Sequence, residues 1–547
     1  MAELLEVTTG QLLEDVAARE GEGEAVVYPD RDLRLSYRAF NDLCRQAARG
    51  MMAYGIEKGD HVAVWTANKP EWLVSQFATG KAGAVLVTVN TSYQQEELAY
   101  LLSQSESSTL ILQPQFKTTS YIEILYNLIP ELRTADPGHL QSDRFPHLKR
   151  VIIVGSEEDY PGVFSWESLL EAGDTVTNQA LDERMESLDH DDVINMQYTS
   201  GTTGFPKGVM LTHSNIVNNG LNIAECMELT SEDRLCIPVP FFHCFGCVLG
   251  TLACVNKGTT MVIVEEFDPK LVMEAVHQER CTGLHGVPTM FIAELNHPDF
   301  DQYNFSSLRT GIMAGSNCPV EVMKAVMEKM GANEVTIAYG QTESSPVITQ
   351  TRTHDTLERK TETVGRALPH VEAKIVDPNT GKEVPAGTQG ELCTRGYHVM
   401  KGYYNDPAAT EEVLTDDGWL HTGDLAVMDE YGYCAITGRI KDMIIRGGEN
   451  IFPREIEEFL YRHPAILDVQ VVGVPEPKYG EEIGAYVRVK EDQETTAEEI
   501  KEFCRGSISH QKIPRYITFV DSYPMTASGK VQKYKLREQA KEIFSRP

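Results

Sequence analysis

The stretch that decides the fold is a glycine-rich and hydroxyl-rich run at residues 198 to 208, which reads Tyr-Thr-Ser-Gly-Thr-Thr-Gly-Phe-Pro-Lys-Gly. Glycines let backbone N–H groups approach phosphate oxygens, hydroxyl groups donate hydrogen bonds, and a lysine adds a mobile positive charge. The apolar residues 193 to 198 predict a strand that runs into this loop, a typical phosphate site of α/β proteins. We therefore expect it to bind a polyphosphate, and a surface loop of the same composition is the alternative. The residues expected to bind are Thr199, Ser200, Gly201, Thr202, Thr203, Gly204 and Lys207.

This run differs from the loop of ordinary P-loop ATPases, in which a glycine directly precedes a Lys-Ser/Thr pair. Here Pro206 precedes Lys207 and Gly208 follows it. The run closely resembles the phosphate loop of the adenylate-forming superfamily, which contains acyl-CoA synthetases, firefly-type luciferases and the adenylation domains of peptide synthetases. The resemblance extends from residues 35–37 to Lys530, and the runs at 390–396 and 444–453 are most similar to medium-chain fatty acyl-CoA synthetases.

Length and charge narrow the classes of protein. The chain has 547 residues, 41% of them hydrophobic, which predicts about two to four domains or subdomains. Its formal net charge of -32 argues against a nucleic-acid or anionic-membrane partner. A phosphate-rich substrate would be repelled by this field at long range, so its site needs a local group of Lys and Arg side chains.

The N-terminal stretch is acidic and has no basic region followed by an apolar one, so we expect no targeting peptide and a cytoplasmic location. The longest apolar stretches, such as residues 82 to 89, are far shorter than the roughly 20 residues of a membrane span. Eleven scattered cysteines suit a reducing compartment, where they pack as small buried hydrophobes. Cys244 and Cys247 form a lone Cys-x-x-Cys, which is weak support for a zinc or redox site.

Alternating strand-like and helix-like segments predict an α/β fold. Residues 59–65 and 83–87 read as strands and residues 96–103 as a helix. A second alternation of strand-like and helix-like segments follows, with strands at 259–264 and 283–287 and helices at 269–279 and 288–295. We therefore expect an N-terminal domain, residues 1–440, with two related α/β subdomains. Short strands at 371–376, 390–394 and 433–437 predict an additional β-rich subdomain.

A small C-terminal α+β domain is expected at residues 441–547. The predicted order is helix 453–461, strands 465–473 and 483–489, helix 497–508 and strand 516–520. A polar turn near Gly438 separates it from the preceding strands. The resemblance implies that this domain is mobile and carries the catalytic lysine.

A second polar run, Tyr339-Gly340-Gln341-Thr342-Glu343, follows the apolar residues 334 to 338 and therefore lies at a strand end, where ligands gather. From their chemistry, we expect Tyr339 to stack on a purine, Thr342 to bond a phosphate oxygen and Glu343 to hold Mg²⁺. Taken alone, the run also fits an ordinary turn that contains a glutamate. The resemblance implies the nucleotide roles, with Gly340 in the same site.

An acidic turn and a later arginine are expected at the ribose. The run Trp-Leu-His-Thr-Gly-Asp-Leu at residues 419 to 425 predicts a tight turn that presents the Asp424 carboxylate. A turn-capping aspartate and a surface ion-pair arginine are the alternatives for Asp424 and Arg439. The resemblance implies that Asp424 binds the ribose and that Arg439 contacts ribose and phosphate.

Lys530, in the loop run Pro-Met-Thr-Ala-Ser-Gly-Lys at residues 524 to 530, matches the catalytic lysine of the superfamily. When a carboxylate attacks the α-phosphorus of ATP, two anions meet and charge builds as pyrophosphate leaves, so a lysine on a flexible stem can neutralise both. The resemblance also implies that the C-terminal domain rotates about the hinge residue Lys441 after adenylation. The glycine loop with Gly447 and Gly448 then helps to form the channel for the incoming thiol.

The acyl pocket is expected around His243, in the run Pro-Phe-Phe-His-Cys-Phe-Gly at residues 240 to 246, which is similar to the aromatic-histidine gate of acyl-CoA synthetases. A satisfied buried histidine is the alternative. Gly315 and Ser316 are expected in the adenine and acyl walls. Many relatives have Gly-Gly-Ala-Pro there, whereas this chain has Ala-Gly-Ser-Asn-Cys-Pro at residues 314 to 319, so the length of the acid stays open.

The expected function is that of an AMP-forming acyl-CoA synthetase that uses ATP, Mg²⁺ and CoA to activate a medium-chain fatty or alicyclic acid. The alternatives are an aryl-CoA or short-chain acid ligase, acyl transfer to a separate carrier protein, a luciferase-like oxygenase and a regulatory protein without catalysis. The intact Lys530 and Glu343 argue against the last of these. We expect small-molecule partners, no nucleic acid and no transmembrane segment, and we leave a homodimer open.

Overall fold

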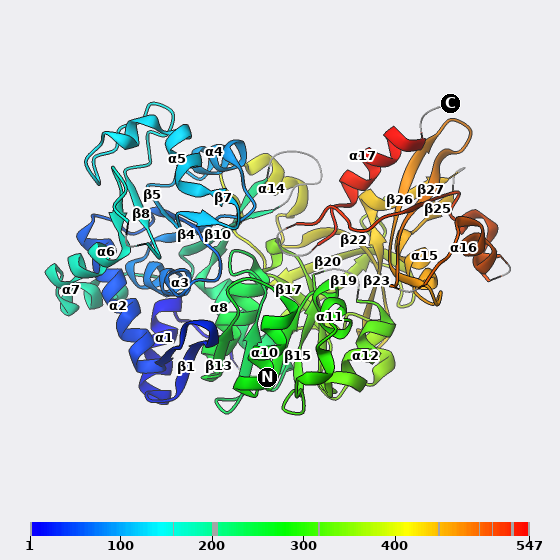
Figure 1. The fold of residues 1–547 in the computed structure, drawn as a ribbon, viewed down its shortest axis with the longest axis horizontal. Coiled ribbons are helices and arrows are strands. Elements are labelled where there is room, and N and C mark those ends of the chain that lie inside the picture. The colour runs from blue at the N-terminus through cyan, green and yellow to red at the C-terminus, as the bar shows by residue number, and fades with distance from the viewer. Residues whose placement is uncertain are drawn as a thin grey trace.

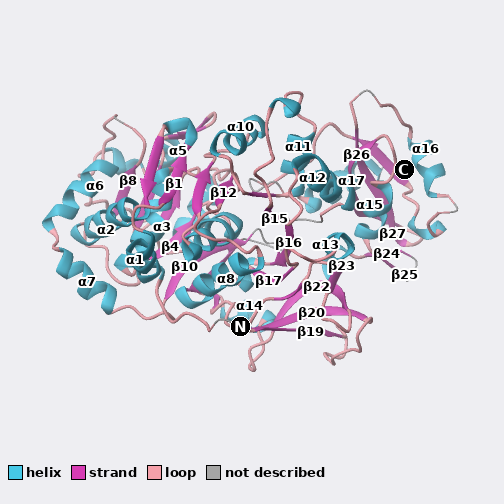
Figure 2. Ribbon diagram, turned by 90° about the horizontal axis from the view of Figure 1, so that it is seen from below, coloured by secondary structure: helices cyan, strands magenta, loops and turns pink. Residues whose placement is uncertain are grey.

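The computed structural model describes residues 3–156, 158–199, 206–315, 318–446, 449–491, 493–505, 507–526 and 530–544. Two large sheets covered by helices form the bulk of the molecule, a smaller antiparallel sheet adjoins them, and the C-terminal residues form a separate lobe at one end (Figure 1, Figure 2). The predicted α/β fold class is confirmed, with its two related subdomains, its β-rich subdomain and its small α+β C-terminal part.

The eight-stranded sheet runs in the order β21-β11-β10-β4-β3-β5-β8-β9. Its strands are β3 (His61–Trp65), β4 (Val85–Thr88), β5 (Thr109–Leu112), β8 (Arg150–Ile153), β9 (Phe164–Ser165), β10 (Val193–Thr199), β11 (Lys207–Thr212) and β21 (Gly402–Tyr403). Strand β10 is parallel to β4 but antiparallel to β11, and Thr199 pairs with Lys207. This pairing holds the two ends of the predicted phosphate loop side by side.

The nine-stranded sheet runs in the order β18-β17-β16-β15-β14-β12-β13-β1-β2. Its strands are β1 (Glu24–Tyr28), β2 (Leu33–Ser36), β12 (Arg234–Ile237), β13 (Thr260–Ile263), β14 (Gly283–Gly286), β15 (Thr310–Ala314), β16 (Thr336–Gly340), β17 (Val347–Gln350) and β18 (Arg366–Ala367). Strands β12 to β16 are parallel. The residues that follow β14, β15 and β16 therefore meet at one edge of the sheet, where α/β proteins bind ligands.

The helices around the two sheets include several that the sequence predicts closely. Helix α10 (Pro269–Glu279) has the predicted bounds because the Asp268 side chain accepts hydrogen bonds from the backbone at its first turn and Pro269 fixes that turn. None of the helices in the described ranges is long and apolar enough to cross a bilayer. The others are α1 (Thr9–Glu20), α2 (Tyr37–Ala53), α3 (Pro70–Ala82), α4 (Gln95–Gln104), α5 (Tyr121–Leu128), α6 (Trp166–Ala172), α7 (Asn178–Glu186), α8 (His213–Cys226), α9 (Ala253–Lys257), α11 (Pro288–Leu295), α12 (Val320–Met330), α13 (Leu357–Glu362) and α14 (Pro407–Val413).

Helix α3 is buried on nearly every side within the main hydrophobic core. Its Lys81 is 0% exposed, and the Lys81 Nζ donates to the Glu14 Oε1 of α1 at 2.6 Å and to the Gly10 carbonyl at 3.2 Å. Burial lowers the pKa of Lys81, and the Glu14 carboxylate opposes that shift. The N-terminal helix α1 therefore supplies the counter-charge for a buried cation.

A π-helix that the sequence analysis does not predict, η4 (Phe245–Leu252), begins within the last residues of the predicted aromatic-histidine gate. Its glycines permit close packing, since a Cβ on Gly246 would lie 2.2 Å from the Pro240 carbonyl oxygen. π-helical turns are frequent at functional sites because they displace side chains from regular helical positions.

The antiparallel sheet next to the nine-stranded sheet contains β19 (Val371–Val376), β20 (Gln389–Gly396), β22 (Leu420–Met428) and β23 (Cys434–Arg439) in that order. The C-terminal lobe contains β24 (Ile444–Arg446), β25 (Glu449–Ile451), α15 (Pro453–Leu460), β26 (Ile466–Glu476), β27 (Gly480–Val489), α16 (Ala497–Cys504), β28 (Tyr516–Phe519) and α17 (Lys533–Phe544). The predicted helix 497–508 is too long, because Arg505 already has an extended backbone (φ −61°, ψ 131°).

Candidate active site

The Lys530 side chain of the C-terminal lobe reaches the ligand edge of the nine-stranded sheet. Two hydrogen bonds close its loop, because the Thr526 N–H donates to the Lys530 carbonyl (2.7 Å) and the Lys530 N–H donates to Thr526 Oγ1 (3.0 Å). The Lys530 Cε lies 3.3 Å from the position that a Cβ on Gly315 would take. Since Gly315 also has a φ of +93°, a larger residue there would be strained and would press on the lysine.

Several groups of the large body act on this lysine. Burial and then Arg439 lower the pKa of Lys530 to about 8, while Cys244, Asp424 and Glu343 oppose the shift. An amine with this pKa is mostly protonated at pH 7, and a bound anion would favour the protonated form further. The lysine is therefore poised to act as a positive charge beside an anionic ligand.

Asp424 is held between two residues predicted to bind the nucleotide. Tyr339 Oη donates to Asp424 Oδ2 at 2.7 Å, and Arg439 Nε donates to Asp424 Oδ1 at 2.8 Å. Asp424 raises the pKa of Arg439, and burial followed by Asp424 raises the pKa of Tyr339. The prediction that Asp424 lies in a tight turn is wrong: it lies within β22 and pairs with Arg439 on β23, and Gly423 (φ +71°) allows the strand to bend there.

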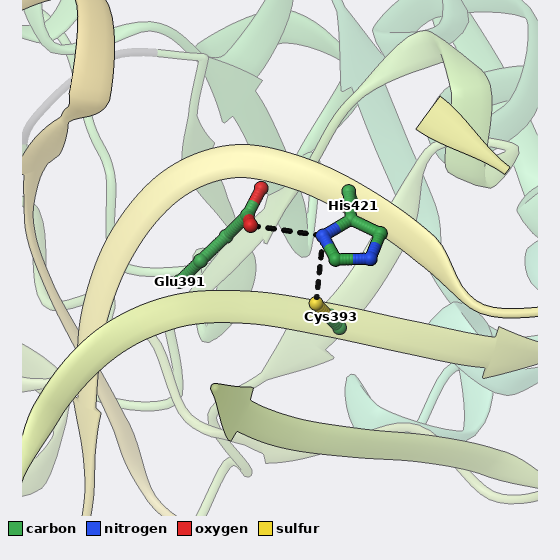
Figure 3. Close-up of side chains that lie close together, drawn as sticks. All are labelled: Glu391, Cys393 and His421. Atoms are coloured by element: carbon green, nitrogen blue, oxygen red, sulfur yellow. Dashed lines mark hydrogen bonds and ion pairs between the residues drawn. The ribbon is translucent and has the colours of Figure 1, made fainter. Parts of the chain in front are cut away.

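Three side chains next to this bend, Glu391, Cys393 and His421, contact one another across β20 and β22 (Figure 3). Glu391 Oε2 lies 2.9 Å from His421 Nδ1, and Glu391 Oε1 accepts from the Gly423 N–H at 3.0 Å. Burial, and then Glu391, raises the pKa of Cys393 to about 12, so its thiol stays protonated at neutral pH. We interpret the three residues as a support for the bend that precedes Asp424.

Tyr403 connects Lys207 with Glu343, although the sequence analysis assigns it no role. Tyr403 Oη donates to Glu343 Oε1 at 2.7 Å, and Lys207 Nζ lies 4.8 Å from the centre of the Tyr403 ring. Tyr403 is 60 residues from Glu343 in the chain, and β21 reaches the site only because it pairs with β11. Glu391 and His421 are missed in the same way, because they lie within quoted runs but carry no recognisable pattern of their own.

The predicted Cys-x-x-Cys belongs to a buried hydrogen-bond network. Cys244 Sγ donates to Gln197 Oε1 at 2.8 Å, and Gln197 Nε2 donates to Cys247 Sγ at 2.9 Å. Burial raises the pKa of Cys244, and a hydrogen bond with the Thr342 side chain opposes that rise. The network therefore links the end of β10 with the Thr342 turn. All eleven cysteines are buried, as predicted, and none of them forms a disulfide.

His243, which directly precedes Cys244 in the chain, is partly exposed. Its Nδ1 accepts a hydrogen bond from the Phe245 N–H at 3.1 Å. Burial, and then Lys530, lowers the pKa of His243 to about 3, so the imidazole is neutral at physiological pH. Gly340, at the end of β16, packs so closely that a Cβ would lie 1.8 Å from the Pro346 carbonyl oxygen.

Of the remaining predicted site residues, Lys441 lies in the described ranges and several others do not. Lys441 lies in η7 (Ile440–Asp442), between β23 and β24, and is exposed. It lines a cavity of about 190 Å³ together with Asp442, Arg537 and Lys541. The predicted residues outside the described ranges are Ser200, Gly201, Thr202, Thr203, Gly204, Ser316, Gly447 and Gly448.

The C-terminal lobe packs on β23 through the start of α15. Arg454 donates a hydrogen bond to the Ile436 carbonyl, and burial lowers the pKa of this arginine. The Phe452 ring lies 3.1 Å from the position of a Cβ on Gly438. This contact seats the lobe so that Lys530 reaches Gly315.

The fold and this site define an adenylate-forming enzyme, with a lysine from a separate lobe beside the residues that follow the strands of a parallel sheet. Sequence comparison agrees, since the family model of the AMP-binding enzymes matches residues 13–404 and that of the AMP-binding enzyme C-terminal domain matches residues 455–530. The chain belongs to the family of AMP-binding enzymes.

Relatives and solved structures match over nearly the whole chain. The chain is 63% identical over 545 residues to the putative acyl-CoA synthetase YngI of Bacillus subtilis (strain 168), which covers 100% of this chain and 99% of YngI. It is 46% identical over 540 residues to the mitochondrial medium-chain acyl-CoA ligase ACSF2 of Homo sapiens, with 97% and 87% covered. The ATP-bound crystal structure of MatB from Rhodopseudomonas palustris is 28% identical, with 99% and 100% covered and a TM-score of 0.84, whereas apo MatB, with the same identity and coverage, gives 0.74.

Proposed function

We propose that the protein is an AMP-forming acyl-CoA synthetase. A carboxylate attacks the α-phosphorus of ATP to give acyl-AMP and pyrophosphate, and the CoA thiol then attacks the acyl carbon to give the thioester and AMP. The observation that carries this proposal is the contact of Lys530 with Gly315, because it brings a cation from the C-terminal lobe to the ligand edge of the sheet.

The nucleoside is assigned to the group around Asp424. Tyr339 offers an aromatic face for adenine, and the Asp424 carboxylate accepts hydrogen bonds from ribose hydroxyls. Arg439, already aligned by Asp424, turns its remaining donors to ribose and phosphate. The polyphosphate is assigned to Thr199, Lys207 and the intervening loop, including residues 200–204.

Lys530 supplies positive charge where the acid and the α-phosphate meet. The ammonium attracts both anions and stabilises the charge that develops on the bridging oxygen as pyrophosphate leaves. His243 and the wall at Gly315 and Ser316 are assigned to the acyl side. Because the His243 imidazole is neutral, it leaves the acid's charge to Lys530.

Glu343 is the residue that would hold Mg²⁺. Its carboxylate is the oxygen ligand that Mg²⁺ prefers, and it is partly exposed next to Tyr403, which also contacts Lys207. When bound, Mg²⁺ neutralises charge on the phosphate oxygens. Thr342, one residue earlier, is assigned a hydrogen bond to a phosphate oxygen.

Residues 441–547 are proposed to move as a unit about Lys441 between the two half-reactions. After rotation, Gly447 and Gly448 would face the site and shape the thiol channel. The higher TM-score with ATP-bound than with apo MatB supports the view that the present arrangement is the one for adenylation. The buried cysteines, none of which forms a disulfide, support a cytoplasmic location, which is part of the proposal.

The acid is proposed to be a medium-chain fatty or alicyclic acid, and the name of the related medium-chain acyl-CoA ligase ACSF2 supports the medium chain length. An aryl or short-chain acid, or a carrier protein as the acceptor, are the alternatives. The test is CoA-dependent AMP release across straight-chain, alicyclic and aromatic carboxylates, with pyrophosphate exchange measured in parallel. A thioester product with an optimum at medium chain length supports the proposal, whereas exchange without a CoA product would overturn it in favour of another acceptor.

A further inference from the structure

Tyr403 lies where two oppositely charged residues of the phosphate site meet. Its side chain is buried, and its hydroxyl donates to Glu343 Oε1 at 2.7 Å. Lys207 Nζ lies over the face of its ring, 4.8 Å from the ring centre. In the part of the chain that the structure describes, no ion pair joins Lys207 to Glu343, and Tyr403 lies in contact with both. Each charge instead contacts the same aromatic side chain.

The backbone fixes this side chain from several directions. The Tyr403 N–H donates to Thr410 Oγ1 at 2.9 Å, and Tyr403 pairs with Val209 on β11, the strand that begins at Lys207. The Met400 N–H donates to the Glu343 carbonyl at 2.9 Å. The β21 segment is therefore attached both to the strand that carries the lysine and to the turn that carries the glutamate.

A direct ion pair between Lys207 and Glu343 would weaken ligand binding, because each charge would have to leave its partner before it could bind phosphate or metal. The face of an aromatic ring attracts an ammonium without neutralising its charge, so Lys207 can leave the ring when a phosphate binds. The phenol occupies one lone-pair region of the glutamate and leaves the other oxygen for a metal.

We propose that Tyr403 is a positioning residue that keeps Lys207 and Glu343 apart before ATP binds. The lysine is then available to the polyphosphate of ATP, and the glutamate is available to the divalent cation that ATP carries. The inference rests on the proposed function for the identity of the ligand. Its central claim, that the ring prevents a neutralising ion pair, concerns only residues of this chain.

The test uses ATP binding by isothermal titration calorimetry on the full chain, with Mg²⁺ and with EDTA. Tyr403→Phe keeps the ring but loses the hydroxyl, so we expect ATP affinity in EDTA within about twofold of wild type and an Mg²⁺-dependent gain reduced by about tenfold. Tyr403→Leu removes the ring, so Lys207 pairs with Glu343 and ATP affinity falls about tenfold even in EDTA. Tyr404→Phe, whose hydroxyl contacts Glu106 instead, is the matched control.

The double variant Tyr403→Leu with Glu343→Gln makes the test independent of the metal. Removal of the glutamate charge should free Lys207 and restore ATP affinity in EDTA to near that of the single Glu343→Gln variant. Failure of this rescue, with melting curves that show intact folding, would overturn the role of Tyr403. If instead the rescue occurs but Mg²⁺ never changes ATP binding to wild type, the positioning role stands and the metal assignment of Glu343 fails. Absence of ATP binding to wild type would contradict the proposed function and Tyr403's role in it together.

Discussion

At the scale of single residues, burial shifts the pKa of both Lys530 and Glu294, but only Lys530 stays charged at neutral pH. The Lys530 amine keeps its charge at neutral pH among other polar groups of the site. The Glu294 carboxyl on α11 is 1% exposed, and its Oε2 has no hydrogen-bond partner among the described residues. Burial alone raises the pKa of Glu294 well above its ordinary value of 4.5. The first charge serves the reaction, whereas ionisation of the second would oppose folding.

Lys530→Ala is expected to lower pyrophosphate exchange by roughly 10²–10³-fold, because a preorganised positive charge is lost where the acid attacks ATP. Thioester formation from supplied acyl-AMP should stay near the wild-type rate, since that step does not use this charge. Both half-reactions are measured separately, and Lys535→Ala on the exposed side of α17 is the control. Equal loss of the two half-reactions would refute the assignment.

Glu294 is expected to make stability fall as pH rises. The unfolded chain loses this proton near pH 4.5 while the folded chain retains it, so each pH unit between 4.5 and the folded-state pKa costs about 1.4 kcal/mol of unfolding free energy. Glu294→Gln should therefore raise the melting temperature at pH 7 to 8 and have little effect at pH 4. The exposed Glu321→Gln on α12 is the control, and an equal shift at both pH values would contradict the argument.

Strand β22 shows, at the scale of secondary-structure elements, how one bend presents a carboxylate. Gly423 breaks the regular pairing, and Glu391 on β20 fixes both the Gly423 N–H and the His421 ring. Asp424 is therefore positioned by a neighbouring strand rather than by a turn of its own. Residues 419–425 predict that an aspartate is presented here, but its strand location depends on contacts with residues 391 and 439.

Glu391→Gln should weaken this support, because a neutral amide accepts more weakly from His421 and Gly423 than a carboxylate does. We expect the KM for ATP to rise by about tenfold, with a much smaller change in kcat, since Asp424 binds the nucleotide but does not react. Steady-state kinetics give both values. Glu372→Gln, on the adjacent strand β19 and exposed, should leave both unchanged, and an unaltered KM in Glu391→Gln would contradict the proposed support.

Local signals explain which elements the sequence predicts well. Helix α10 carries its own start signals in Asp268 and Pro269, and its predicted bounds match the structure. The end of α16 is overestimated, because the apolar periodicity continues past the point where the backbone of Arg505 becomes extended. Tyr403 is not predictable from its neighbours, since its role arises from the pairing of β21 with β11 across nearly 200 residues. Thus helix capping can be predicted from neighbouring residues, whereas the pairing of strands that are distant in sequence cannot.

The whole molecule consists of a large body and a lobe, and the contacts of the lobe with the body include those on β23. Arg454 and Phe452 of the lobe pack against Ile436 and Gly438, while Lys530 extends to Gly315. The lobe position that adenylation needs therefore depends on a few side chains far from the reacting atoms. Small hinged contacts of this kind permit movement between two arrangements.

Arg454→Met should weaken this docking while it retains most of the apolar volume. We expect adenylation to slow by about tenfold, the order expected for loss of a charged hydrogen bond, and thioester formation from supplied acyl-AMP to be unchanged. Separate assays of the half-reactions check this, with the exposed Arg462→Met as control. A slower second half-reaction would indicate that the same contact also serves the rotated arrangement.

The buried ammonium of Lys81 has a practical consequence for anyone who shortens or tags this protein. Its counter-ion, Glu14, belongs to the first helix of the chain. A clone that starts after α1 would lose both the counter-ion and the helix that covers Lys81, so that water would reach the ammonium and the apolar residues of α3 beside it. Any shortened version of the protein should therefore keep α1.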